Sequence, residues 1–459
     1  MKWLLAAFLA APLLAQAQGV VLFLGDGMGV STVTAARILA GQQAGKDGEA
    51  HELSFESFEN VALVKTYNLD RQVPDSAGTM TAIVTGQKAN FGAISVAPSV
   101  LRGSCQAALE APLTSLLEMA EAAGFSTGVI STARITHATP AATYAHVSER
   151  DWESDGLLPP QAVAEGCRDI ARQLVEFDVG DGPEVILGGG RAHFLPREEA
   201  DPEYPEATGR RKDGRNLIEE WLSLGDDRQF VWNAEQFQAL TPGQGRALGL
   251  FEPSHMQYEA DRADDIGGEP SLATMTGFAI EALQSRNKPF FLMVEGGRID
   301  HGHHAGNAYR ALHDTLALDA AVAVAEGLLD PKRSLILVTA DHSHTMTISG
   351  YPRRGNPILG KAEAIPGQPL TDMRGLPYAT LGYANGPGYG KDLPNLTDTN
   401  TQDRNFLQPA TIPMPSETHA GEDVAAYARG VGAHLVRGVM EQNELFDALY
   451  MGLFGVPAR

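Results

Sequence analysis

Cysteine and positive charge are both scarce in this chain. Only two of its 459 residues are cysteines, Cys105 and Cys167, and neither their separation nor their neighbours suit a zinc site or a catalytic thiol. Lys and Arg number 35 against 57 Asp and Glu, so the formal net charge at pH 7 is −22. Because a surface of that sign repels the phosphate backbone of nucleic acid, we expect no nucleic acid as a specific partner.

Long apolar runs are missing beyond the first residues. Residues 1–17, MKWLLAAFLAAPLLAQA, place Lys2 before an apolar run and end in a small-x-small pattern that signal peptidase accepts. No later segment has the roughly 18 to 20 apolar residues of a spanning helix, and the C-terminal MGLFGVPAR does not resemble a lipid-anchor signal. We therefore expect a signal peptide at 1–17 and an exported protein, periplasmic or secreted, without a membrane anchor.

Export changes the interpretation of the two cysteines. In an oxidising compartment a pair of cysteines favours a disulfide over free thiols. We therefore predict that Cys105 and Cys167 form a disulfide bond.

Short apolar runs alternate with helical stretches along the chain. The runs are GVVLFLGDGMG, STGVIST, PEVILGG, PFFLMVEGG and SLILVTADHSH, and each ends in polar or glycine residues. Buried strands without polar alternation are typical of a parallel sheet covered on both faces. We therefore predict an α/β fold with a central, mostly parallel β-sheet flanked by helices on both faces.

Two segments interrupt this alternation. Residues at about 191–270 are polar, and residues at about 350–415 are rich in Pro, Gly and Asn, so both are interpreted as irregular insertions. We expect residues 18–459 to form a single catalytic domain that carries both insertions.

The stretch VEGGRIDHGHH gathers groups that bind metals. Asp300 and His304 are four residues apart, so on one helical turn they point the same way. Carboxylate oxygen and neutral imidazole nitrogen both suit Zn²⁺. TADHSH adds Asp341 and His342 at another strand end, and SETHAGED adds His419. A single such pair is commonly a surface turn, but convergence at successive strand ends favours a metal centre.

The motif LGDGMGVS follows the first strand. Its glycines are spaced GxGxG, unlike a dinucleotide fingerprint, and Asp26 stands where a pyrophosphate needs neutral N–H donors. A carboxylate held by a tight glycine turn, which metals can approach closely, is the better interpretation.

The motif VPDSAGTMTAIVTG provides a candidate nucleophile. Ser76 is expected at or near a helix N-terminus, where backbone N–H groups favour an anion. Ser or Asp at such a place is most often only a helix cap, but beside metals the hydroxyl of Ser76 could act as a nucleophile. No G-x-S-x-G elbow surrounds it, which argues against an α/β-hydrolase esterase.

Six motifs together resemble one known family. GDGMG, PDSAGT, THATPAATYAHVSERDW, VEGGRIDHGHH, TADHSH and ETHAGEDV occur in the order found in alkaline phosphatases, and the sequence is most similar to the animal-type members. The resemblance covers essentially the whole chain from Gly19. It implies the alkaline phosphatase fold and hydrolysis of phosphate monoesters through a phosphoserine, at a site with two Zn²⁺ and one Mg²⁺. It also implies a homodimer, for which the 350–415 insertion is the expected interface.

The resemblance assigns roles residue by residue. Ser76 would be the nucleophile, and Arg150 would grip the substrate phosphate. The implied metal ligands are Asp300, His304 and His419 for one zinc, Asp26, Asp341 and His342 for the other, and Asp26, Thr139 and Glu295 for Mg²⁺. His137 and His301 stand where the best-known bacterial form has Asp and Lys, and would lie beside Mg²⁺ and the phosphate.

Two further expectations concern residues near these motifs. A further cation, Ca²⁺ or Mg²⁺, is implied in the polar insertion, with Glu203, the Phe251 carbonyl, Glu252 and Glu269 as oxygen ligands. His303 has no implied role, and we expect an exposed or hydrogen-bonded loop histidine.

Other functions remain open at this point. A phosphodiesterase or sulfatase of the same superfamily would use a similar sheet and metals, but DSAGT offers no sulfatase C/S-x-P-x-R context, and Arg150 suits a monoester dianion. A non-enzymatic, exported metal-binding protein would explain the ligands but not Ser76 and Arg150 beside them.

Overall fold

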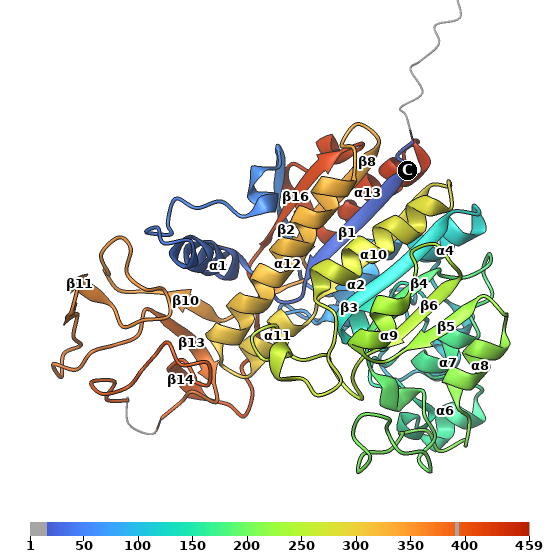
Figure 1. Cartoon of the computed structure of the whole chain (residues 1–459), viewed down its shortest axis with the longest axis horizontal. Coiled ribbons are helices and arrows are strands. Elements are labelled where there is room, and N and C mark those ends of the chain that lie inside the picture. The colour runs from blue at the N-terminus through green and yellow to red at the C-terminus, as the bar shows by residue number, and fades with distance from the viewer. Residues whose placement is uncertain (1–15, 391–393, 459) are drawn as a thin grey trace, which may run out of the picture.

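The structure is a computed structural model that describes residues 16–390 and 394–458 (Figure 1). The signal peptide expected at 1–17 lies outside the described residues, apart from Gln16 and Ala17. Within the described part of the chain no helix is long and apolar enough to cross a membrane.

A ten-stranded sheet forms the centre of the molecule. Its strands are β1 (Gly19–Gly25), β2 (Asn60–Lys65), β3 (Ser126–Arg134), β4 (Val185–Gly189), β5 (Arg228–Val231), β6 (Arg246–Leu250), β7 (Phe290–Gly296), β8 (Ser334–Ala340), β16 (Val424–Gly430) and β17 (Gly438–Glu441). Their order is β17-β2-β16-β8-β1-β7-β3-β4-β6-β5. β16 runs antiparallel to both β2 and β8, and the other neighbouring strands are parallel. The predicted α/β class with a mostly parallel sheet is confirmed.

Helices cover both faces of this sheet. They are α1 (Val30–Gln43), α2 (Ser76–Thr85), α3 (Cys105–Glu110), α4 (Leu116–Ala122), α5 (Ala138–Ala141), α6 (Pro160–Ala164), α7 (Ile170–Val175), α8 (Leu217–Ser223), α9 (Ala234–Ala239), α10 (Leu272–Ser285), α11 (Arg298–His304), α12 (Ala308–Leu328) and α13 (Leu445–Phe454). Short 3₁₀ turns lie at Ser54–Ser57, Asp155–Leu157, Arg191–His193, Arg262–Asp264, Ala433–Leu435 and Gln442–Glu444. α10 and α12 cross the front of the sheet in Figure 1, whereas α2, α4 and α13 pack together on the other side.

The central strands are buried on both faces, which explains their uninterrupted apolar sequences. Every residue of β1, β7 and β8 is buried. The longest helix, α12, starts at Asn307, whose side chain accepts a hydrogen bond from the Arg310 backbone N–H. Its buried residues include Ala311, Leu318 and Val322, with the spacing of one helical face. Packing of this face on the sheet holds the site-bearing strand ends in place.

The two irregular segments differ in their relation to the sheet. The segment at about 191–270 is not only an insertion, because it supplies β5 and β6, the last two strands at one edge of the sheet. Both strands are short, and polar loops surround them, so apolar periodicity did not reveal them. By contrast, the segment after β8 forms small separate sheets at the left of Figure 1, from β10 (Met346–Ile348), β11 (Glu363–Ile365), β12 (Gln368–Pro369), β13 (Leu381–Gly386) and β14 (Ala410–Pro413).

The predicted disulfide is present. Cys105 and Cys167 are joined, with their Cα atoms 6.0 Å apart. Cys105 opens α3, and Cys167 lies just before α7, so the bond ties the two ends of the segment between them.

Candidate active site

The candidate active site lies at the carboxyl ends of β1, β7 and β8. Gly25 at the end of β1 pairs in register with Gly296 of β7 and Ala340 of β8. The residues that follow these strands therefore meet at one edge of the sheet. Asp26 follows β1, α11 with Asp300 follows β7, and Asp341 follows β8.

Gly27 allows the turn after β1 to close on this edge. Its φ is +67°, a left-handed conformation that favours glycine. A Cβ atom at this position would also lie only 2.4 Å from the His344 ring. The backbone N–H of Gly27 donates to Asp341 Oδ1 over 3.0 Å. This turn therefore brings the Asp26 segment against Asp341.

One cluster of ligand groups surrounds Asp300. His304 Nε2 and His419 Nε2 each lie 3.3 Å from Asp300 Oδ1, and the two imidazole nitrogens are 3.1 Å apart. Asp300 and His304 lie one turn apart on α11, as the sequence predicts, and His419 comes from β15 (His419–Ala420), which pairs with β9 (Ser343–His344). Carboxylate and imidazole at such distances suit Zn²⁺.

A second cluster surrounds Ser76, the first residue of α2. Its Oγ donates to Asp26 Oδ1 over 3.3 Å and lies 3.1 Å from His342 Nε2. His342 Nε2 is also 3.4 Å from Asp26 Oδ1 and 3.3 Å from Asp341 Oδ2. The side chain of Asp75, not Ser76, caps α2 by accepting from the Gly78 backbone N–H. The hydroxyl of Ser76 is therefore free of a capping role.

A third cluster joins Asp26 to the ends of β7 and β3. Ligand atoms of Asp26, His137 and Glu295 all lie within 4.8 Å of one another. Thr139, on the short helix α5 that follows β3, has a buried hydroxyl that lacks a hydrogen-bond partner among the described residues. Glu295 also accepts a short hydrogen bond from Ser131 Oγ on β3.

The donor atoms of these clusters fit metal ions. Asp26 Oδ2, Asp341 Oδ2, His342 Nδ1 and Glu295 Oε1 are buried without a hydrogen-bond partner in the described part of the chain. Buried polar atoms are normally paired, so these unpartnered atoms on neighbouring residues are the kind of donors that cations bind. Burial, and then the charge of Asp341, raise the pKa of Asp26, and burial raises the pKa of Glu295 to about 7. Cations would remove this electrostatic cost.

Arg150 is bound to Asp75, the residue that precedes the serine. Its guanidinium donates to Asp75 Oδ2 over 3.0 Å, and its other terminal nitrogen lies 3.1 Å from His137 Nε2. Arg150, His304 and His419 are partly exposed, whereas Ser76 is buried. A substrate would therefore reach Ser76 past these three side chains, and a guanidinium fork suits its phosphate oxygens.

Two important residues were not recognised in the sequence. His344 Nε2 lies 2.8 Å from Asp300 Oδ1, and its Nδ1 lies 2.5 Å from Glu417 Oε2. Although burial opposes it, hydrogen bonding to Asp300 and Glu417 raises the pKa of His344 to about 10. The two hydrogen bonds of His344 thus join Asp300 to Glu417. His344 follows His342 by two residues and Glu417 precedes His419 by two, a strand-like spacing that could have drawn attention to both.

His303 differs from the expected exposed loop histidine. It is completely buried on α11. Its Nε2 lies 3.0 Å from Thr32 Oγ1, and its Nδ1 lies 2.8 Å from the Tyr383 hydroxyl. It is hydrogen-bonded, but as a helix residue that joins α1, α11 and β13. Because α11 turns this side chain inward, it contributes to packing rather than to a loop.

A cluster of carboxylates lies in the 191–270 segment. Ligand atoms of Glu203, Glu252 and Asp265 lie within 4.8 Å of one another, so Asp265 joins the residues named from the sequence. Burial raises the pKa of Glu252 to about 8, and burial followed by the charges of Glu252 and Asp265 raises the pKa of Glu269 to about 9. Glu269 thus lies against the cluster but outside its closest triad. Phe251 is buried beside Glu252.

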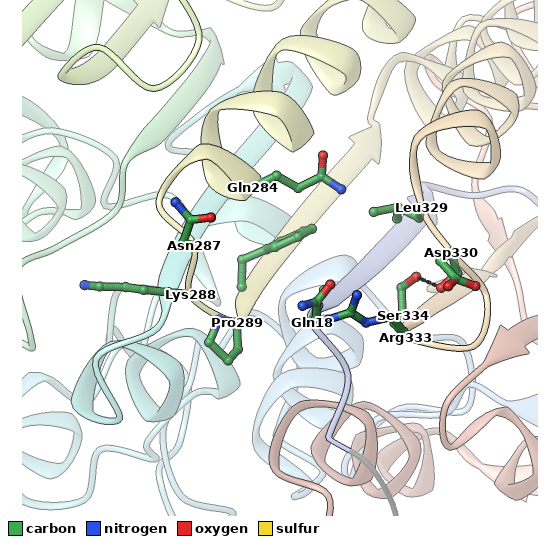
Figure 2. Close-up of a pocket in the computed structure, with 11 residues that line it drawn as sticks. Gln18, Gln284, Asn287, Lys288, Pro289, Leu329, Asp330, Arg333 and Ser334 are labelled. Atoms are coloured by element: carbon green, nitrogen blue, oxygen red, sulfur yellow. Dashed lines mark hydrogen bonds between the residues drawn. The ribbon is translucent and has the colours of Figure 1, made fainter.

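A cavity of about 320 Å³ lies away from these clusters (Figure 2). Its walls include Gly19, Phe290 and Ser334, which begin β1, β7 and β8, so it is at the amino end of the sheet. No histidine, cysteine or glutamate is among the residues that line it. Asp330 is the only acidic side chain among the described residues that line it.

Comparison with protein families and curated sequences gives consistent matches. The sequence profile of a family described as alkaline phosphatase matches residues 17–453. The tissue-nonspecific alkaline phosphatase of Gallus gallus is 47% identical over 443 residues, which cover 94% of this chain and 84% of that protein. The corresponding isozyme of Homo sapiens is 45% identical over 437 residues, covering 93% and 82%.

Solved structures share the fold at lower identity. An alkaline phosphatase from Thermus thermophilus superposes with a TM-score of 0.69 and 23% identity, over 97% of this chain and 92% of that one. An alkaline phosphatase from the Antarctic bacterium TAB5 gives a TM-score of 0.64 with 22% identity, covering 96% and 98%.

Proposed function

The chain belongs to the alkaline phosphatase family and is a metal-dependent hydrolase of phosphate monoesters, and we propose that it transfers the phosphoryl group through Ser76. The observation that carries this proposal is the position of the Ser76 hydroxyl. It stands at the N-terminus of α2, between the carboxylate of Asp26 and the ring of His342, with Arg150 on the side open to solvent.

We assign the metals by the same geometry. Asp300, His304 and His419 would hold one Zn²⁺, and Asp26, Thr139 and Glu295 a Mg²⁺, with His137 beside it. Asp26, Asp341 and His342 would hold the other Zn²⁺; in this structure Asp26 and His342 group with Asp300, and Asp341 Oδ2 lies 3.3 Å from His342 Nε2. These ions would lower the pKa of the serine hydroxyl and of water and neutralise phosphoryl charge. The unpartnered buried donor atoms support this assignment.

The chain's own groups position the reactants. Arg150 is pre-oriented by Asp75, which holds one of its terminal nitrogens, so the guanidinium can grip two phosphate oxygens. The N–H groups at the start of α2 favour the anion. Attack by Ser76 Oγ, which gives up its proton to solvent, forms the P–Oγ bond as the P–O bond to the alcohol breaks, and the leaving alkoxide takes up a proton from solvent. Water then attacks phosphorus, the P–Oγ bond breaks, and inorganic phosphate leaves while Ser76 is regenerated. His301 would contact the phosphate from the α11 side.

The remaining assignments rest on similar reasoning. We propose a further cation, Ca²⁺ or Mg²⁺, with Glu203, Glu252, Glu269 and the Phe251 carbonyl as its oxygen ligands, and we add Asp265, which groups with Glu203 and Glu252. Oxygen-only ligands and raised carboxyl pKa values support a hard cation there.

The proposals for oligomeric state and cellular location rest on exposed apolar side chains and on the leader sequence. We propose a homodimer, because large apolar side chains are exposed on the 350–415 segment, among them Tyr351, Ile365, Met373 and Ile412. Sedimentation of the purified protein would test this proposal. The leader sequence supports export to a periplasm or to the medium.

Substitution of Ser76 tests the nucleophile. Ser76→Ala should abolish the acid-stable phosphoenzyme that forms from a labelled monoester, while α2 keeps its cap because Asp75 is unchanged. Ser271→Ala is the matched control, since Ser271 caps α10 away from the site. Equal labelling of Ser76→Ala and wild type would refute the assignment. Rates on a monoester, a diester and a sulfate ester should favour the monoester.

A further inference from the structure

The ring of His301 is held in place without a hydrogen bond of its own. Its Nδ1 is buried, and none of the described residues hydrogen-bonds to it. Two other histidine rings surround it instead. The centroid of His255 lies 4.0 Å from that of His301, and the centroid of His137 lies 5.5 Å away. His255 is thus the nearer support of a residue that faces the phosphate site.

His255 itself is firmly anchored. The Arg134 backbone N–H donates to its Nδ1 over 3.2 Å, and the Arg134 guanidinium lies 2.5 Å from its Nε2. Two hydrogen bonds of 2.7 Å join the same guanidinium to both carboxylate oxygens of Glu153. A neutral imidazole has one acceptor nitrogen and one N–H, so His255 can accept only one of these two contacts as a hydrogen bond, and two facing N–H groups favour the uncharged ring.

The backbone on either side of His255 is equally constrained. The Met256 N–H donates to the Thr132 carbonyl over 3.1 Å. The Thr132 hydroxyl in turn accepts from the backbone N–H of Arg298, the first residue of α11. A Cβ on Gly189 would lie 2.2 Å from the Ser254 carbonyl, so this loop is pressed against the end of β4. The loop with His255 and the helix with His301 are therefore fixed to the same strand end.

We propose that His255 is a positioning residue, which sets the orientation of the His301 ring and through it the affinity of the site for phosphate. The support runs from Glu153 through Arg134 and His255 to His301. This inference rests on the proposed role of His301 at the phosphate. His255 transfers no proton and contacts no reacting atom in this arrangement, so its effect should appear in phosphate binding rather than in the chemical step.

Two substitutions separate the parts of this support. His255→Phe keeps a ring against His301 but loses the ring nitrogen that accepts from Arg134. His255→Asn keeps a short acceptor but loses the ring contact. We expect His255→Asn to raise the inhibition constant of inorganic phosphate and KM about two- to tenfold, the range that the loss of one aromatic contact supports. His255→Phe, which keeps the ring contact but loses the link to Arg134, should raise both constants less than His255→Asn does, and kcat should change by less than about twofold in both variants.

A double-mutant cycle provides the decisive measurement. If His255 acts through His301, His255→Asn should have little further effect in a His301→Ala background. His313→Asn is the matched control, because the His313 ring also stacks on a neighbouring ring, Tyr309, at 4.1 Å, but on α12. Thermal unfolding of each variant verifies that it is folded.

The outcomes distinguish this inference from the proposed function. Three results would overturn the positioning role: full additivity of the two substitutions, equal effects of His255→Phe and His255→Asn, or an unchanged phosphate inhibition constant in His255→Asn. None of these results would affect the proposed function, provided that wild-type turnover and Ser76 labelling are observed. Failure of Ser76 labelling in the wild type would refute the proposed nucleophile, whatever the His255 variants show.

Discussion

Removal of the disulfide between Cys105 and Cys167 should destabilise the protein while leaving the chemistry of the folded enzyme unchanged. The two cysteines are 62 residues apart. Closing a loop of that length reduces the entropy of the unfolded chain by an amount equivalent to about 4 kcal/mol at 25 °C. The enclosed segment includes His137, Thr139 and Arg150, three of the residues proposed for the Mg²⁺ and phosphate sites.

The comparison uses wild type and a Cys105→Ala/Cys167→Ala variant, both loaded with metal. Alanine avoids the burial of a hydroxyl where Cys105 is only 3% exposed. Urea unfolding, followed by near-UV circular dichroism and by monoester turnover, should give a lower midpoint for the variant. A reductant should lower the wild-type midpoint towards the same value and leave the variant unaffected. At urea concentrations where both are folded, kcat should agree within about twofold.

Two results would contradict this reasoning. Equal midpoints would mean that the cross-link does not restrict the unfolded chain as the loop-closure argument requires. A large fall in kcat of the folded variant would mean that the bond holds His137, Thr139 and Arg150 in their native positions, so that its main effect is on the folded state.

Three further predictions concern buried charge. Burial raises the pKa of Glu269 to about 9, far above the ordinary 4.5, so the cation-free protein should lose stability as the pH rises from about 4.5 to 9. Added Ca²⁺ should therefore raise the thermal midpoint at pH 9 but scarcely at pH 5. An equal rise at both pH values would contradict this reasoning. Burial likewise raises the pKa of Asp314 to about 8, so Asp314→Asn should unfold at a higher temperature than wild type at pH 9, an advantage that should vanish at pH 4. His344→Phe keeps a ring but loses the hydrogen bonds to Asp300 and Glu417, and should lower zinc affinity about tenfold in a chelator competition, whereas unchanged affinity would show that Asp300 needs no such support.

The acidic cluster and the active site share one short loop. Glu252, at one end of the loop, belongs to the carboxylate triad, and His255, three residues later, packs against His301. The side chain of Gln257 donates to Glu252 Oε1 over 2.7 Å, and its backbone N–H donates to Glu269 Oε1 over 3.0 Å. A cation in the cluster would therefore order the same loop that holds His255 against His301.

Most residues of the proposed site could be predicted from the sequence, because the proposed ligands occur beside strand ends and glycines. Asp26 and Asp341 follow apolar runs directly, and Asp300 and His304 are spaced by one helical turn. Once a parallel sheet is inferred, its geometry brings such residues to one edge. Arg150 and Thr139 could not be selected from their local sequence. Only the family resemblance assigned them a role.

Tertiary structure alone decided the partners that hold these groups. His344 meets Glu417 across 73 residues, and His255 meets Arg134 across 121. No local period connects residues so far apart, because such contacts depend on loop paths and on the packing of whole elements. For the same reason the polar surroundings of β5 and β6 concealed two strands of the central sheet, and Asp265 joined the acidic cluster only through the fold of its loop. Local sequence therefore determined which groups carry the chemistry, and long-range packing determined which residues orient them.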